Sequence, residues 1–410
     1  MQSTLRTAVP LWLGRASERS RRRYPSLKGR VDVDAAIIGG GIVGATVAET
    51  FSRAGVRVAV VEAELAGHGS TAASSALLMQ EPDDHLGALA KRYGGKAASR
   101  IWELCRAGAR DFAKTLRRLD IACDLAERDS VYYATDVNAV PALRTEHERR
   151  RTDGFGGRWL DAAALRRATG ITGAAGISTT GNAQLDPYRA CLGLLWSAQE
   201  HGARIFEHSE VQRIDATSTG VNVRTRDGTI VARQAVIATG YANAIFKPLA
   251  GRFTLKHTYV LATEPVDART RHALGLGDVL LWDTKRPYHY ARWTKDRRLL
   301  LGGGDRPLVP PRSRARAFTE GTRAVRQYFD GLFPALEGIG IDYAWEGLFA
   351  ITPDGLPYIG PHRRYPRRLF ALGYGGNGMT FGFLAARMLL EHFSGVPSAD
   401  HRLFAFNRFR

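Results

Sequence analysis

The segment from Asp34 to Glu62 constrains the fold more than any other part of the chain. "DAAIIG" has the apolar run of a short buried strand, "IVGATVAETFSRAG" has helical periodicity, and "VRVAVVE" is strand-like again. The turn before the helix carries the spacing G-x-G-x-x-G at Gly39, Gly41 and Gly44. Gly39 allows a tight turn, Gly41 lets the backbone approach a pyrophosphate, and Gly44 permits close helix–strand packing. The segment therefore predicts a βαβ unit that binds a dinucleotide.

An acid stands where such a unit holds a ribose. Glu62 ends the second predicted strand, 18 residues after Gly44, and can accept hydrogen bonds from an adenosine ribose. An acid rather than a basic residue at this position argues against a 2′-phosphate. Ile42 and Val43 open the helix, whose free N–H groups favour phosphate binding, and Ala63 follows Glu62 in the same predicted site.

Two later stretches continue the predicted nucleotide site. "GHGSTAASS" at 67–75 has small residues that suit a backbone passing close to a flat ligand, and "AVIATG" at 235–240 is an apolar strand that can return beside the nucleotide. The hydroxyl groups of the first stretch would bond phosphate or ribitol, or would cap a helix N-terminus. Taken by itself, the second stretch is more typical of a plain core strand. The candidate ligand contacts in these two stretches are Ser70, Thr71, Ser74, Ser75, Thr239 and Gly240, and Val211, between the stretches, is a further candidate.

A second glycine-rich helix start, "GYGGNGMTFG", lies at residues 373–382. No acid follows it at ribose distance, so it is not a second nucleotide cradle. Free N–H groups and a positive helix end would instead suit a flavin ring, which gathers negative charge on reduction. The alternative is an ordinary glycine-capped turn. The candidate contacts are Gly375, Gly376, Asn377, Gly378, Met379 and Thr380, and they favour FAD over NAD.

Length, charge and cysteine content restrict the number of domains and the kinds of partner and site that the chain can have. A chain of 410 residues exceeds what one core usually supports, so we expect two domains. The net charge of +18 invites an anionic partner, but the 50 Arg are scattered, and a solvated surface charge explains them without nucleic acid. The three cysteines have neither disulfide nor metal-site spacing, and no run of 18 apolar residues exists. We expect a cytoplasmic protein without a metal site, and peripheral membrane contact stays open.

Taken together, the motifs resemble the D-amino acid oxidase superfamily of FAD enzymes, which includes glycine oxidase, sarcosine oxidase and the D-amino acid dehydrogenases. The resemblance rests on the βαβ segment, "AQLDPYRACLGLLWSAQEHGARIFEHSEV", "AVIATG", "YARWTKDRRLLLGGG", "WEGLFAITPDGLPYIGP" and "GYGGNGMTFGFLAARML". These pieces lie in family order over most of residues 34–390. "RYPSLKG" before the first strand resembles the branch related to γ-glutamylputrescine oxidoreductase.

The resemblance implies an α/β fold, in which a Rossmann-like FAD-binding domain carries an inserted β-rich α+β substrate domain. We expect an irregular arm at 1–30, an FAD-binding domain at 31–82, 160–250 and 340–410, and a substrate domain at 83–159 (helical) and 251–339 (β-rich). The implied reaction oxidises the C–N bond of an amine or amino acid by hydride transfer to flavin N5, giving an imine that hydrolyses.

The family pattern also suggests substrate contacts. Arg292 matches the Arg with which related enzymes hold a substrate carboxylate, and Tyr290 and Tyr259 are candidate walls of the pocket. Members with flavin linked to Cys or His carry the linking residue at the positions of Gly347 and Ala73. Both residues point to non-covalent FAD. His68, just before the Ser-Thr pair, is a weak candidate for a linkage.

Other functions stay open at this point. A 2-hydroxy-acid dehydrogenase would want a His base, for which His257 and His289 are available. A basic flavoprotein acting on nucleic acid or tRNA, or an FAD-binding protein without turnover, is compatible with the same fold. "LGGGDRP" at 301–307 does not complete a second nucleotide motif. Oxygen, a quinone or another protein would then accept the electrons.

Overall fold

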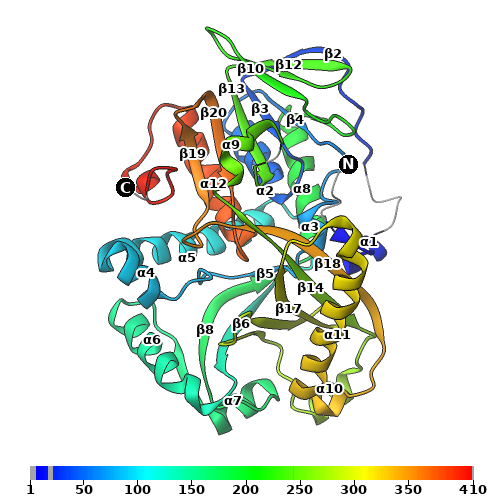
Figure 1. The fold of residues 1–410 in the computed structure, drawn as a ribbon, viewed down its shortest axis with the longest axis vertical. Coiled ribbons are helices and arrows are strands. Elements are labelled where there is room, and N and C mark those ends of the chain that lie inside the picture. Colours follow the sequence, from blue (N-terminus) through cyan, green and yellow to red (C-terminus); the bar gives the residue numbers. More distant parts are fainter. Residues whose placement is uncertain (1–5, 17–21, 243, 409–410) are drawn as a thin grey trace.

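The computed structural model describes residues 6–16, 22–242 and 244–408. A six-stranded sheet with its helices fills the upper half of Figure 1, and a larger ten-stranded sheet fills the lower half. The predicted arm at 1–30 falls partly outside the described residues, at 1–5 and 17–21. Within the described part of that arm, a short helix α1 (Leu11–Gly14) buries Leu11 and Trp12 against the body of the protein.

The six-stranded sheet is built around the predicted βαβ unit. All neighbouring strands in it run parallel except the β19–β20 pair. The central strands are buried on both faces, which explains their continuous apolar sequences. Its order is β19 (Tyr358–His362), β20 (Tyr365–Leu372), β13 (Gln234–Gly240), β3 (Ala35–Ile38), β4 (Val58–Val61) and β9 (Arg204–Phe206).

Alternate residues of these strands face two different layers. Ile37 and Val60 pack into a helical core, and Ile38 and Val61 pack into a second core on the opposite face. The helical layer consists of α2 (Ile42–Arg53), α5 (Gly95–Arg118), α8 (Pro187–Glu200) and α12 (Gly378–Phe393). The opposite layer contains a four-stranded sheet of β10 (Arg213–Ala216), β11 (Val221–Arg224), β12 (Gly228–Ala232) and β2 (Gly29–Asp32).

The ten-stranded sheet forms the second half of the molecule. Helix α11 (Arg314–Leu332) covers one face through Val325 and Phe329, and the other face turns toward the six-stranded half (Figure 1). Along its main path the strands are β1 (Arg6–Thr7), β18 (Ile341–Ile351), β14 (Thr254–Thr263), β17 (Leu299–Pro307), β16 (His289–Trp293), β15 (Leu280–Asp283), β6 (Ala126–Ala134), β8 (Ala175–Gln184) and β5 (Leu77–Leu78), and β7 (Arg158–Asp161) pairs with β8.

Short helices complete the two halves. They are α3 (Ser70–Ala73), α4 (Leu86–Tyr93), α6 (Val140–Thr152), α7 (Ala162–Thr169), α9 (Lys247–Ala250) and α10 (Ala268–Ala273). Two local features follow directly from the sequence. Asp186 caps α8 by accepting the N–H groups of Tyr188 and Arg189, and β11 and β12 form the hairpin around Asp227 and Gly228.

Sheet and layer membership depart from the expected domain boundaries in several places. Strands β7, β8 and β18 belong to the ten-stranded sheet, although residues from 160 and from 340 onward were expected in the FAD-binding domain. Strand β5, in the expected segment 31–82, also pairs into that sheet, and α5, expected in the substrate domain, packs in the helical layer of the six-stranded sheet. Because β8 has a polar sequence, with Gly181 at φ +88°, hydrophobic periodicity did not predict it as a strand. The domain boundaries themselves stay a prediction.

Candidate active site

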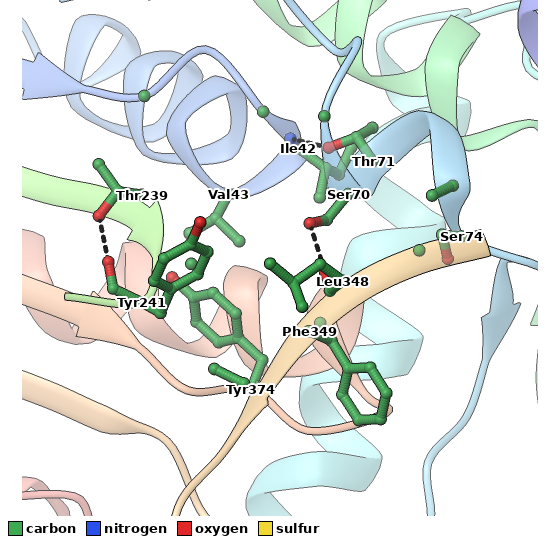
Figure 2. A pocket seen from close by; sticks show the side chains of 18 of the residues that line it. Ile42, Val43, Ser70, Thr71, Ser74, Thr239, Tyr241, Leu348, Phe349 and Tyr374 are labelled. Atoms are coloured by element: carbon green, nitrogen blue, oxygen red, sulfur yellow. Dashed lines mark hydrogen bonds between the residues drawn. The ribbon is translucent and has the colours of Figure 1, made fainter. Parts of the chain in front are cut away.

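One cavity of about 890 Å³ runs between the two halves of the molecule. At one end it is lined by the glycine turn before α2, and at the other by strands of the ten-stranded sheet. Figure 2 shows Ile42, Val43 and Thr71 on one side of this space and Leu348 and Tyr374 facing them. The predicted cofactor residues that line it are Gly39, Gly41, Ile42, Val43, Glu62, Ala63, Ser70, Thr71, Ser74, Ser75, Val211, Thr239, Gly240, Gly375, Gly376, Asn377, Gly378 and Met379.

The glycine turn has the geometry that its spacing predicts. Gly39 adopts φ +109°, which side chains rarely allow, and a Cβ on Gly44 would lie 1.8 Å from the Gly39 carbonyl oxygen. The turn therefore delivers the N-terminus of α2 directly to the cavity. Gly44 does not line the cavity, and its contact with the Gly39 carbonyl agrees with the close packing expected of it within the predicted dinucleotide site.

The acid after β4 is held by backbone donors. Glu62 Oε2 accepts the Gly40 N–H at 2.7 Å, and Oε1 accepts the Glu64 N–H at 3.0 Å. Burial raises the pKa of Glu62 against these hydrogen bonds. The side chain lines the cavity at the end of β4, where a ribose hydroxyl would meet a fixed acceptor.

The hydroxyl groups around the turn mostly bond to the protein itself (Figure 2). Thr71 Oγ1 accepts the Ile42 N–H at 2.9 Å, Ser70 Oγ donates to the Leu348 carbonyl at 2.8 Å, and Thr239 Oγ1 donates to the Tyr241 carbonyl at 2.8 Å. These bonds fix the walls of the cavity. Thr71 accepts an N–H at the start of α2 and also lines the cavity, so a contact between its hydroxyl and a ligand stays a prediction.

The second glycine stretch reaches the same cavity from the C-terminal end of the chain. The Gly376 N–H donates to Asp83 Oδ2 at 2.6 Å, and Asn377 Nδ2 donates to the Glu81 carbonyl at 2.8 Å. Helix α12 therefore starts at the cavity with its glycine turn tied to residues 81–83. Thr380 lies behind this turn, where its hydroxyl donates to the Met79 carbonyl at 2.6 Å, so its expected cofactor contact is corrected.

Aromatic side chains form the opposite end of the cavity. Trp282, Tyr288 and Tyr290 line it from β15, from the loop before β16, and from β16. Tyr290 Oη lies 3.3 Å from Thr258 Oγ1, and its ring fits because residue 302 is glycine: a Cβ there would lie within 2.5 Å of the ring. Burial raises the pKa of Tyr290 to about 12, so its hydroxyl stays protonated at neutral pH.

Two of the three expected catalytic residues do not face this space. Arg292 is buried beneath Trp12, and its Nε and Nη2 donate to the carbonyls of Ser75 and Leu185 at 2.6 and 2.8 Å. Arg292 shares a sheet face with Tyr290 but lies one alternation further along β16, beyond the cavity. Its expected carboxylate contact is therefore corrected.

Tyr259 is corrected for a different reason. It points to the α11 side of the sheet, where a Cβ on Gly321 would touch its ring, and its neighbour Thr258 takes the cavity side. The two candidate histidines also lie outside the cavity. His257 is buried against Glu346, with 3.5 Å between Nδ1 and Oε1, and His289 Nδ1 lies 3.2 Å from an oxygen of Asp283.

Three acidic residues of this region were missed by the sequence analysis: Glu81, Asp83 and Asp305 line the cavity. Burial raises the pKa of Asp83 to about 6 and also raises the pKa of Asp305. Glu81 and Asp83 follow β5 in a loop, and Asp305 stands near the end of β17. The "EPDD" run offers no periodicity or known motif spacing that would have marked it.

A parallel sheet with a glycine turn, an acid after its second strand, and a second sheet closing one long cavity together define a two-domain dinucleotide-dependent redox protein. The model of the FAD dependent oxidoreductase family (DAO) matches residues 34–392. The chain belongs to this family, and the resemblance seen in its motifs is confirmed.

Individual relatives are similar over nearly the whole chain. Gamma-glutamylputrescine oxidoreductase of Escherichia coli is 27% identical over 388 residues, which cover 93% of this chain and 88% of the relative. Glycine oxidase of Bacillus licheniformis is 26% identical, covering 91% of this chain and 96% of the relative. The crystal structure of glycine oxidase from Geobacillus kaustophilus superposes with a TM-score of 0.76 at 23% identity, covering 92% and 99% of the two chains, which shows the same fold.

The cavity fits the FAD that this family uses. Gly41, Ile42 and Val43 at the start of α2 line the cavity, so the positive end of this helix is available to a pyrophosphate, although the Ile42 N–H is bonded to Thr71. Glu62 suits the ribose, and the start of α12 offers a positive helix end to the ring. Gly347 and Ala73, at the two positions where the family resemblance implied a linking residue, lie side by side in the wall: a Cβ on Gly347 would be 2.9 Å from that of Ala73.

Proposed function

We propose that this protein is an FAD-dependent oxidase or dehydrogenase that oxidises the C–N bond of an amine or amino acid. The observation that supports it most is the single cavity shared by the glycine turn of α2, the glycine turn of α12 and the aromatic end formed by Trp282, Tyr288 and Tyr290. When bound, FAD supplies a two-electron acceptor for the hydride on the carbon next to nitrogen, which leaves an imine that water hydrolyses.

The residues of the chain then have a positioning task. A C–H bond must be aimed at the acceptor, and the reacting nitrogen must be neutral. The Tyr290 hydroxyl, braced by Thr258, can orient that nitrogen, while Trp282 and the Leu348 segment exclude water from the reacting carbon. No strong base is required for this chemistry; the two candidate histidine bases lie outside the cavity, and His68, which lines it, has Nε2 3.3 Å from Tyr188 Oη.

Anaerobic mixing tests the proposal. The holoenzyme is mixed with amines, D- and L-amino acids and 2-hydroxy acids while the flavin absorbance is recorded. We expect bleaching by an amine or amino acid, whereas bleaching by hydroxy acids alone would replace the proposal. Tyr290→Phe should slow reduction about five- to tenfold through one lost hydrogen bond, and Tyr259→Phe, on the far face of the sheet, is the matched control.

The remaining features are proposals of the same kind. We propose that FAD is held without a covalent bond, because Gly347 and Ala73 offer no linking atom, and that oxygen, a quinone or another protein accepts the electrons. Denaturation in acid should release free FAD, and reoxidation rates with each acceptor should differ. Every helix among the described residues is too short or too polar to cross a membrane. A cytoplasmic location, peripheral membrane contact and the absence of a nucleic-acid partner stay predictions.

A further inference from the structure

Glu81, Asp83 and Asp305, the carboxylates at the aromatic end of the cavity, form no salt bridge with the residues that the structure describes. Glu81 is 2% exposed; Oε1 accepts the Ser130 hydroxyl at 3.1 Å, and Oε2 has no hydrogen-bond partner. Asp83 and Asp305 form no salt bridge with any residue that the structure describes. A buried carboxylate without a partner is costly, because the protein replaces the water that it lost with nothing of opposite charge.

These groups are held in place by the fold. Asn182 Nδ2 donates to Ser130 Oγ at 3.0 Å, and the Asn182 amide oxygen accepts the Gln80 N–H at 2.8 Å, so a buried chain of hydrogen bonds fixes Glu81. Asp83 is tied to the Gly376 N–H at 2.6 Å. Fixed carboxylates are preorganised and need no rearrangement to bind a cation.

Aromatic rings stand beside the carboxylates. Ser130 and Tyr132, two residues apart on β6, point to the same face of the sheet. Ser130 bonds to Glu81, and Tyr132 stacks on Trp282 with ring centroids 3.9 Å apart, so Glu81 and Trp282 reach the cavity from that one face. A Cβ on Gly376 would lie 2.6 Å from Tyr288 Oη and 2.8 Å from Asp83 Oδ1, so both groups meet at one point. Aromatic faces with nearby carboxylates favour ammonium groups.

Basic side chains around the cavity do not neutralise these carboxylates. Among the described lining residues, Lys247 is the only Lys or Arg, and it lies on α9 in the other half of the molecule. Arg286 is close enough to lower the pKa of Asp83, but it is exposed and bonds to His85 and to the Lys285 carbonyl. Lys256 and His289 likewise lower the pKa of Asp305, but neither forms a salt bridge with it.

We propose that the substrate carries a second positive charge besides the amine that reacts, and that Glu81, Asp83 and Asp305 bind it between the rings of Trp282 and Tyr288. The site thus takes a diamine or a longer polyamine rather than an amino acid whose carboxylate needs an Arg. The substrate class rests on the proposed amine oxidation. The site formed by Glu81, Asp83 and Asp305 for the second positive charge, called the dication site below, can be tested by binding alone.

Three probes with the same four-carbon chain separate the alternatives: 1,4-diaminobutane, n-butylamine and 4-aminobutanoate carry a positive, a neutral and a negative group at the end that does not react. Anaerobic stopped-flow mixing with the holoenzyme gives the limiting reduction rate and the dissociation constant of each probe. We expect 1,4-diaminobutane to bind at least about tenfold more tightly than n-butylamine, and 4-aminobutanoate to bind weakest, because one hydrogen bond to a charged group is worth that factor or more. Equal constants for the three probes, or tightest binding of 4-aminobutanoate, would overturn the proposal.

Substitutions assign the site. Glu81→Gln and Asp83→Asn keep an acceptor for Ser130 and Gly376 and should each weaken 1,4-diaminobutane about tenfold or more while leaving n-butylamine within about twofold. Asp84→Asn is the matched control, because Asp84 adjoins Asp83 but pairs with Arg92 at 3.0 Å outside the cavity. Flavin content and the thermal midpoint of each variant show that it has folded. Losses of equal size for all three probes would refute a charge-specific role.

Calorimetric titration of the oxidised holoenzyme with 1,4-diaminobutane separates failure of this proposal from failure of the proposed function. Binding that depends on Glu81 without any reduction of the flavin would support the dication site and sink the amine-oxidising function. Reduction by n-butylamine and 4-aminobutanoate, with no measurable preference for the diamine, would leave the function intact and overturn the dication site.

Discussion

Replacing Arg292 by Ala should destabilise the fold and leave recognition of carboxylate substrates unchanged. The guanidinium makes two charged hydrogen bonds, to Ser75 O at 2.6 Å and Leu185 O at 2.8 Å, and stacks on Trp12 with 5.1 Å between its Cζ and the ring centroid. Each such bond contributes about 1.5–3 kcal/mol, and its loss leaves a buried carbonyl unpaired. We therefore expect the free energy of unfolding to fall by about 3–5 kcal/mol, a large part of the stability of an ordinary domain.

Urea unfolding of the flavin-saturated protein, followed by tryptophan fluorescence, measures this loss. Lys295→Ala, on the turn after β16, removes an exposed cation that pairs with Asp124 at 3.1 Å and should cost less than about 1 kcal/mol. The ratio of kcat/KM for 4-aminobutanoate to that for n-butylamine should be the same in Arg292→Ala and in the parent. A stable Arg292→Ala protein with a selective loss of carboxylate substrates would falsify this placement and restore the family-based assignment.

Gly44→Ala should prevent flavin binding, because the new Cβ would lie 1.8 Å from the Gly39 carbonyl oxygen. The flavin content, measured as flavin absorbance per protein chain, checks this prediction, and full flavin content would contradict the packing argument. Gly376→Ala should cost about 1–3 kcal/mol by displacing Tyr288 Oη and the Asp83 carboxylate, read as a lower urea midpoint. The pKa of Asp83 is raised to about 6, so the stability that its protonated form contributes is present below the ordinary pKa of an aspartate and is lost as pH rises through 6. Affinity for 1,4-diaminobutane should show the opposite trend and fall as pH drops below 6, because the carboxylate becomes protonated. A pH-independent dissociation constant between pH 5 and 8, measured by calorimetry, would contradict the assignment of Asp83.

The FAD half of the site could be predicted because its information is local. The turn from Gly39 to Gly44 and the acid at Glu62 lie on one βαβ unit, whose geometry follows from glycine spacing and strand periodicity. The second glycine stretch, though far away in sequence, is again a strand, a turn and a helix read in order. In both cases neighbouring residues form the cavity wall, so long-range packing was not needed to find it.

The substrate half depends on register and on segments that meet only in the folded protein. A register shift in the β14–β17 pairing, between His257 and Tyr259, and the alternation along β14 decide that Thr258 faces the cavity. Position along β16 decides that Tyr290 lines the cavity and Arg292 does not. A one-residue difference in such assignments moves a side chain to the other face of a sheet, and sequence alone does not set it.

The acidic end of the cavity shows why total charge is a poor guide to the ligand. A net charge of +18 and 50 Arg favour an anionic partner when the chain is treated as one charged body. Exposed charges are screened within about 10 Å at 0.1 M salt, so the scattered Arg contribute little at the cavity. Glu81 and Asp83 lie at the cavity itself, where low dielectric strengthens the field of each carboxylate. The local field therefore favours a cation inside a strongly basic protein, and a substrate screen should begin with diamines rather than with anions.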